Sequence, residues 1–84
     1  MTLHPRVVTA AARGGFRVHL GFTDGSKATV DLAPWVAGKG GVFGPLQNEA
    51  FFSQVAVDVD AGTICWPNGA DFDPDVLYEA AING

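Results

Sequence analysis

The chain has 84 residues, and we expect residues 1–84 to form a single domain with a thin core. Hydrophobic residues make up 48% of the sequence and charged residues 17%, so we expect an apolar surface patch that contacts a protein partner or forms a homodimer. The net charge is -4, and the acidic second half of the chain argues against direct binding to nucleic acid, which requires a basic surface.

The first half of the chain predicts three strands. Residues 6–11 are β-branched and apolar, as in a first strand. Residues 16–23 then alternate between apolar and polar, which is typical of a strand with one buried face. That face is predicted to consist of Phe16, Val18, Leu20 and Phe22. The Asp24-Gly25 pair turns the chain into residues 27–32, and the three strands are expected to form an antiparallel meander.

The second half predicts helices and a second hairpin. The glycine-rich residues 33–45 predict an irregular connection with one helical turn, and residues 46–54 predict a short helix. Residues 55–59 and 63–66 alternate as two strands around a turn. Together with a last helix, the order β-β-β-α-β-β-α predicts a two-layer α+β fold, an antiparallel meander sheet with helices on one face.

Residues 66–75 form the most tightly specified connection in the chain. Pro67 suits the second position of a β-turn, and Asn68 suits the positions that follow it. Asp73 is predicted to cap the last helix, with Pro74 at its first position. The packing stripe of that helix is predicted to be Val76, Leu77, Ala80 and Ala81.

Charge is divided unequally between the two halves of the chain. Residues 1–39 hold all five basic side chains and two acidic ones, a net of +3, whereas residues 40–84 hold seven acidic side chains and no basic one, a net of -7. Such a field steers a small basic protein partner toward the acidic half, although acidic surfaces often serve only solubility. The predicted partner-binding residues are Trp66, Asn68, Asp71, Asp73, Asp75 and Glu79.

No group of residues has the spacing of a catalytic or metal site, so we expect no enzyme, no cofactor and no bound metal. The aspartates at positions 71, 73 and 75 alternate as at the start of a calcium loop, but the sixth position is Val76 and the twelfth is Ile82. A small-molecule sensor, with a pocket among Trp35, Trp66 and Tyr78, is the alternative function.

The cysteine content and the hydropathy pattern predict a soluble protein of a reducing compartment, the cytoplasm. Cys65 is the only cysteine, so no internal disulfide can form. It stands in a short apolar strand, which predicts a buried and unreactive thiol. No apolar run approaches the ~20 residues of a membrane span, so we expect no contact with a membrane.

Several short motifs, spread over nearly the whole chain, are those of one known family. They are Phe22-x-Asp24-Gly25, Val30-Asp31-Leu32, Gly41-Val42-Phe43-x-x-Leu46, Phe52-x-x-Val55 and Thr63-Ile64-x-Trp66-Pro67-Asn68-Gly69-Ala70-Asp71-x-x-Pro74-Asp75-x-Leu77-Tyr78. The sequence therefore resembles the bacterial domain-of-unknown-function family numbered 2442. The resemblance implies a small α+β domain without assigned catalytic residues. It also implies a small protein encoded next to this one, in a pair similar to a toxin and its antitoxin.

Overall fold

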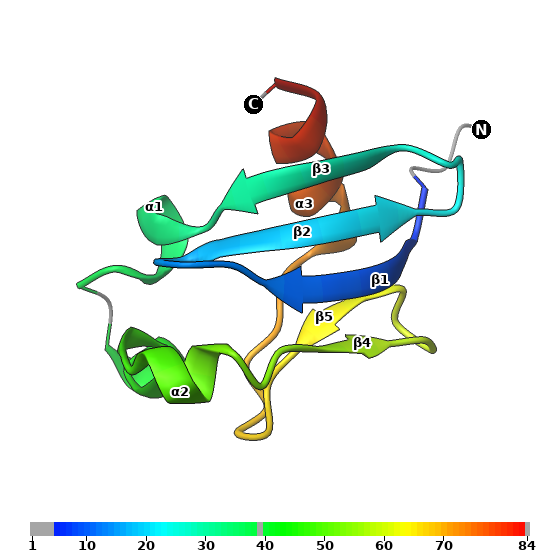
Figure 1. Cartoon of the computed structure of the whole chain (residues 1–84). Coiled ribbons are helices and arrows are strands. Elements are labelled where there is room, and N and C mark those ends of the chain that lie inside the picture. The colour runs from blue at the N-terminus through cyan, green and yellow to red at the C-terminus, as the bar shows by residue number, and fades with distance from the viewer. Residues whose placement is uncertain (1–4, 39, 84) are drawn as a thin grey trace.

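The computed structural model describes residues 5–38 and 40–83, and within them it contains five strands, three α-helices and two turns of 3-10 helix (Figure 1). In chain order these are β1 (Val7–Ala12), β2 (Arg17–Phe22), β3 (Lys27–Asp31), α1 (Ala33–Val36), η1 (Gly41–Phe43), η2 (Pro45–Gln47), α2 (Glu49–Phe52), β4 (Ala56–Asp58), β5 (Thr63–Cys65) and α3 (Pro74–Asn83). The predicted α+β fold and its order β-β-β-α-β-β-α are confirmed, with additional short helical turns in the connection after β3.

The first three strands form the predicted antiparallel meander, in the order β1-β2-β3. On β2, the alternation places Val18, Leu20 and Phe22 in the core, while Phe16 just before the strand is half-buried. The residues between them, Arg17 and His19, point to the opposite face of the sheet. One face of this sheet is therefore covered, and the other, which we call the open face, carries polar side chains.

The second hairpin is a separate two-stranded sheet, β4-β5, which lies beside β1 (Figure 1). The prediction of a strand through residues 55–59 was too long, because β4 ends at Asp58. The carboxylate of Asp58 accepts hydrogen bonds from the backbone N–H groups of Asp60, at 3.1 Å, and Ala61, at 3.2 Å. These bonds turn the chain at once, so Val59 lies in the turn with 77% of its surface exposed.

The helix predicted over residues 46–54 is shorter and begins later than expected. Leu46 belongs to η2, and α2 spans only Glu49–Phe52. Between them Asn48 has an extended backbone and its side chain accepts a hydrogen bond from the N–H of Phe51 at 3.1 Å. Asn48 is thus the N-cap of α2, which is why one continuous helix does not form.

The core lies between the covered face of the three-stranded sheet and the helices, with α3 behind the sheet (Figure 1). Leu77 of α3 is fully buried, while the other three predicted stripe residues of α3 are half-buried. The cap of α3 is confirmed, because the carboxylate of Asp73 accepts a hydrogen bond from the N–H of Asp75 at 2.8 Å and Pro74 is the first helical residue.

None of the helices within the described residues combines the length and the apolar character that crossing a membrane requires.

Candidate interaction surface

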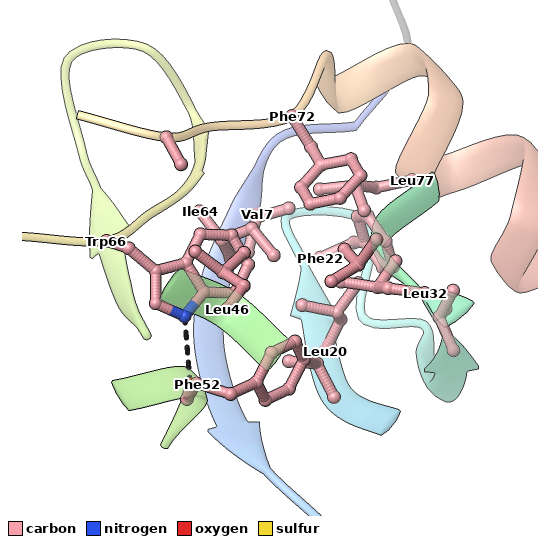
Figure 2. Packing of buried hydrophobic residues seen from close by; sticks show 14 residues of the cluster. Val7, Leu20, Phe22, Leu32, Leu46, Phe52, Ile64, Trp66, Phe72 and Leu77 are labelled. Carbon is pink, nitrogen blue, oxygen red and sulfur yellow. Dashed lines mark hydrogen bonds between the residues drawn. The ribbon is translucent and has the colours of Figure 1, made fainter. Parts of the chain in front are cut away.

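The connection between β5 and α3 is held to the rest of the domain by three side-chain hydrogen bonds. The indole N–H of Trp66 donates to the carbonyl oxygen of Phe52 at 2.8 Å, drawn as a dashed line in Figure 2. The hydroxyl of Thr63 donates to the carbonyl oxygen of Phe72 at 2.6 Å. The side-chain amide of Asn68 donates to the carbonyl oxygen of Val42 at 2.8 Å. The connection is therefore a fixed part of the fold.

The turn inside this connection has the predicted geometry. The N–H of Gly69 donates to the carbonyl oxygen of Trp66 at 3.0 Å, and Gly69 has a φ of 89°. The side-chain oxygen of Asn68 accepts a hydrogen bond from the N–H of Ala70 at 3.1 Å. Pro67 and Asn68 thus form the centre of a β-turn, and glycine follows because the left-handed conformation costs it little.

Phe72 is the centre of a cluster of aromatic rings below this connection. Its ring centroid lies 6.4 Å from that of Trp35, 5.6 Å from that of Phe43 and 5.8 Å from that of Trp66. Phe72 and Trp66 are 7% and 3% exposed, whereas Trp35 keeps 38% of its surface exposed. Trp35, at the outside of the cluster, is therefore open to solvent. Phe72 and Trp66 belong to the core, as Figure 2 shows.

Polar and apolar side chains surround Phe72 at the surface. Asp71 and Asp73 are exposed, as expected from an extended segment whose middle residue points inward. Val42, whose carbonyl oxygen binds Asn68, is 52% exposed. We define the Phe72 surface as the exposed residues next to Phe72 in the chain or attached to its cluster. They are Trp35, Val42, Asn68, Asp71 and Asp73.

The negative charge of this surface continues along α3. Asp75 and Glu79 are exposed and four residues apart, so they share one side of the helix. With Asp71 and Asp73 they form what we call the acidic strip. Within the part of the chain that the structure describes, no side chain donates a hydrogen bond to the carboxylate of Asp71 or Glu79. The charge at these two positions is therefore uncompensated.

Two basic side chains bind backbone carbonyl groups elsewhere instead. Arg6 donates to the carbonyl oxygens of Val59 and Asp60, and Arg17 donates to the carbonyl oxygen of Gly14 at 3.0 Å. Arg17 and Lys27 are exposed on strands whose other side faces the core. The open face thus carries Arg17 and Lys27 together with Asp31, whereas α3 and the segment before it carry four acidic side chains and no basic one.

Five of the six predicted partner-binding residues are exposed, namely Asn68, Asp71, Asp73, Asp75 and Glu79. Trp66, the sixth, lies in the core, because its indole fills the space between Phe52 and Phe72. Trp66 therefore supports the surface from the core and is not an exposed part of it. Trp35 and Val42 were missed as surface residues, and only their hydrophobic character in a glycine-rich connection hinted at a covering role.

The three aromatic residues of the alternative sensor hypothesis occupy two different places. Trp35 and Trp66 both contact Phe72. Tyr78 instead packs its ring on Phe22, with centroids 5.2 Å apart, and its hydroxyl donates to the carboxylate of Asp24 at 3.1 Å. The structure therefore places Tyr78 at the turn between β2 and β3.

The Asp24 carboxylate joins this turn to α3. The hydroxyl and the N–H of Ser26 both donate to it, followed in strength by the hydroxyl of Tyr78, and these bonds hold the pKa of Asp24 below its ordinary value. The same bond raises the pKa of Tyr78, because the phenolate would face a carboxylate. Asp24 is exposed and Tyr78 is half-buried, so this contact joins α3 to the turn at the surface of the domain.

The cysteine and the described histidine, the residue types most often used in catalysis and metal binding, lie apart from each other in the structure. Cys65 is half-buried in β5, less deeply than predicted. The Nδ1 atom of His19 lies 3.0 Å from the hydroxyl oxygen of Thr29 across the open face. Among the described residues, no three histidine, cysteine, aspartate or glutamate side chains come together as a metal site would require.

The fold and the surface define a small two-layer α+β domain with an acidic, partly aromatic face on a rigid support. The chain belongs to the family of proteins of unknown function DUF2442, whose model matches residues 7–83. No curated protein and no solved structure matches the chain.

Proposed function

We propose that this chain is a non-enzymatic interaction domain that binds a small basic protein through the Phe72 surface and the acidic strip. The observation that carries the proposal is that the exposed Trp35 packs on the buried ring of Phe72, whose two neighbours in the chain, Asp71 and Asp73, are exposed. Tryptophan is enriched among the residues that contribute most to binding at protein interfaces. Carboxylates beside it favour lysine and arginine side chains from the partner.

The rigidity of the support strengthens this proposal. Binding costs less conformational entropy where the surface is already ordered, and the three hydrogen bonds from Trp66, Thr63 and Asn68 fix the backbone that carries it. The negative charge of the acidic strip, which is uncompensated at Asp71 and Glu79, adds long-range attraction, which raises the association rate and makes it sensitive to salt. A fixed apolar patch thus gives the affinity, and the carboxylates give the preference for a basic partner.

The biological setting is proposed from the family resemblance and the single cysteine. We place the protein in the bacterial cytoplasm and propose that its partner is the small basic protein encoded beside it, which it neutralises as an antitoxin does. Cys65, the only cysteine, fits a reducing compartment. A homodimer through the same surface is the competing occupant, and oligomeric state in the absence of the partner separates the two.

The test is co-purification with the small protein encoded by the neighbouring gene, followed by titration of the purified pair. The double variant Asp71→Asn/Asp73→Asn should weaken the complex by about 3- to 20-fold, as expected for two exposed charge pairs. Asparagine at position 73 can still cap α3, so the fold is kept. Asp31→Asn, on the open face, is the matched control and should leave the affinity unchanged.

Two results would contradict the proposal. One is a complex whose affinity for the partner is as high with the double variant, and also with Trp35→Ala, as with the native chain. The other is a complex whose affinity does not change with ionic strength, because exposed charge pairs are screened at high salt. A stable dimer of the isolated chain that the Trp35→Ala variant converts to monomer would favour the homodimer instead.

A further inference from the structure

A small pocket lies between the β1–β2 turn and the start of α2, and the proposed function does not use it. Gly15, Phe16, Gln47 and Glu49 line it, and its volume is about 190 Å³. Pockets for drug-sized ligands have volumes of roughly 300 to 1,000 Å³. The size of this pocket therefore suits one long side chain rather than a metabolite.

Two walls of the pocket are held in place by contacts outside it. The side-chain amide of Gln47 donates to the carbonyl oxygens of Val36 and Phe43, and its oxygen accepts a hydrogen bond from the N–H of Gly38. The ring of Phe16 packs edge-to-face on Phe52, with centroids 5.7 Å apart. Neither wall can move without losing these contacts, so the pocket exists before any ligand arrives.

The residues that line the pocket include one aromatic and one acidic residue. Phe16 is half-buried, and Glu49 is exposed as the first residue of α2. Within the described residues, nothing donates a hydrogen bond to the carboxylate of Glu49. Arg17, the neighbour of Phe16, turns its guanidinium to the carbonyl of Gly14 instead of to this carboxylate.

A ring and a carboxylate on one small pocket are the groups that bind a guanidinium. Its planar face packs on an aromatic ring, and its N–H groups form paired hydrogen bonds with a carboxylate. We propose that the pocket binds an arginine side chain of the partner protein. The ammonium group of lysine carries the same charge but is compact and strongly hydrated, so it gains less from the ring.

The pocket adjoins the Phe72 surface through η1 and η2. The ring of Phe43 contacts that of Phe72, while the carbonyl oxygen of Phe43 accepts a hydrogen bond from Gln47 at 3.2 Å. One partner segment can therefore reach both places. This inference rests on the proposed function in one respect, that the arginine belongs to the partner protein. Binding of arginine by the pocket can be tested separately with a free ligand.

The test is a titration of the ¹⁵N-labelled chain with N-acetyl-arginine methylamide, followed through the backbone amide signals. We expect saturable shifts at Gly15, Phe16, Gln47 and Glu49. The citrulline analogue, which has the same shape without the charge, should give no saturable shift. Glu49→Gln should weaken the arginine ligand by about fivefold or more, because a charge-assisted pair is lost. Asp60→Asn, at an exposed carboxylate in the β4–β5 turn, is the matched control and should leave binding of the arginine ligand unchanged.

Three outcomes would overturn the inference: no shift at the four lining residues, equal binding of the citrulline analogue, or equal binding of N-acetyl-lysine methylamide. Phe16→Leu tests the ring separately and should also weaken the arginine ligand. The two proposals fail independently. A partner complex that is weakened by Asp71→Asn/Asp73→Asn but unchanged by Glu49→Gln refutes the pocket alone. Arginine binding without any partner complex refutes the proposed function alone.

Discussion

The guanidinium of Arg6 lies directly over Gly62, in the space that a side chain at position 62 would occupy. A Cβ built on Gly62 would be 2.7 Å from the Cζ atom of Arg6. From this position Arg6 donates to the carbonyl oxygens of Val59, at 3.1 Å, and Asp60, at 2.7 Å. The N–H of Val7 also donates to the carbonyl oxygen of Gly62 at 3.0 Å. The start of β1 is thus fastened to the β4–β5 turn at a position that requires glycine.

The first prediction follows from this contact. Gly62→Ala should destabilise the domain by about 2 to 3 kcal/mol, because alanine is strained at a φ of 69° and its methyl group displaces Arg6 from two carbonyl oxygens. Gly69→Ala is the matched control. Residue 69 has a φ of 89° and open space around a Cβ, so only the backbone strain of about 1 to 2 kcal/mol applies.

Chemical denaturation measures both variants, and an Arg6→Ala background separates the two causes. In that background Gly62→Ala should cost no more than Gly69→Ala, because the displaced side chain is already absent. If the difference between the two glycine variants stays the same without Arg6, the contact over Gly62 does not contribute to stability.

The second prediction concerns the hydrogen bond under the Phe72 surface. Trp66→Phe should destabilise the domain by about 1 to 2 kcal/mol, since it removes the buried donor to the carbonyl oxygen of Phe52 and leaves unfilled space in the core. Trp35→Phe, at a more exposed ring, should cost less than about 1 kcal/mol. Equal losses in thermal or chemical unfolding would show that the buried hydrogen bond is not what distinguishes the two tryptophans.

The position of Trp66 also shows which parts of the structure the sequence could predict. The alternation on β2, the Pro67-Asn68 turn and the Asp73 cap are decided by residues adjacent in the chain, and each is present where the sequence places it. The burial of Trp66 depends on Phe52, which is 14 residues away and in a different element. Local composition made Trp66 a candidate surface residue because it stands beside a polar turn.

The candidate sites needed the fold for the same reason. The Phe72 surface joins Trp35, Val42 and Asp71, and the pocket joins Phe16 to Glu49, and in neither case does a periodic pattern link these positions. The early end of β4 and the late start of α2 have local causes, in the side chains of Asp58 and Asn48. Both residue types are common in turns and caps, so this signal was present in the sequence and was outweighed by hydrophobic spacing.

The third prediction separates the two roles of Asp73. Asp73→Ala should lower the free energy of unfolding by about 1 kcal/mol, because the N–H of Asp75 loses its acceptor. Asp73→Asn should cost less than about 0.5 kcal/mol, since asparagine caps a helix nearly as well as aspartate. Denaturant midpoints measure the effect on α3, and partner affinity measures the effect of charge. A cap that contributes nothing would give the same midpoint for both variants.

The last prediction concerns pH and the bond between Tyr78 and Asp24. The pKa of Asp24 is lowered from 3.8, so its contribution to stability is complete above that value and is lost as pH falls through the folded-state pKa. The pKa of Tyr78 is raised from 10.0, so its contribution is complete below pH 10 and is lost as pH rises through the folded-state pKa. The difference in melting temperature between the native chain and Tyr78→Phe should therefore be largest near neutral pH and shrink toward both extremes.

Asp24→Asn tests the carboxylate separately, because asparagine at position 24 does not change its charge in acid. The melting temperature of this variant should fall less than that of the native chain below pH 3.8. A difference between the native chain and Tyr78→Phe that is the same at all pH values would mean that the ring packing on Phe22, and not the hydroxyl, holds α3 at this turn.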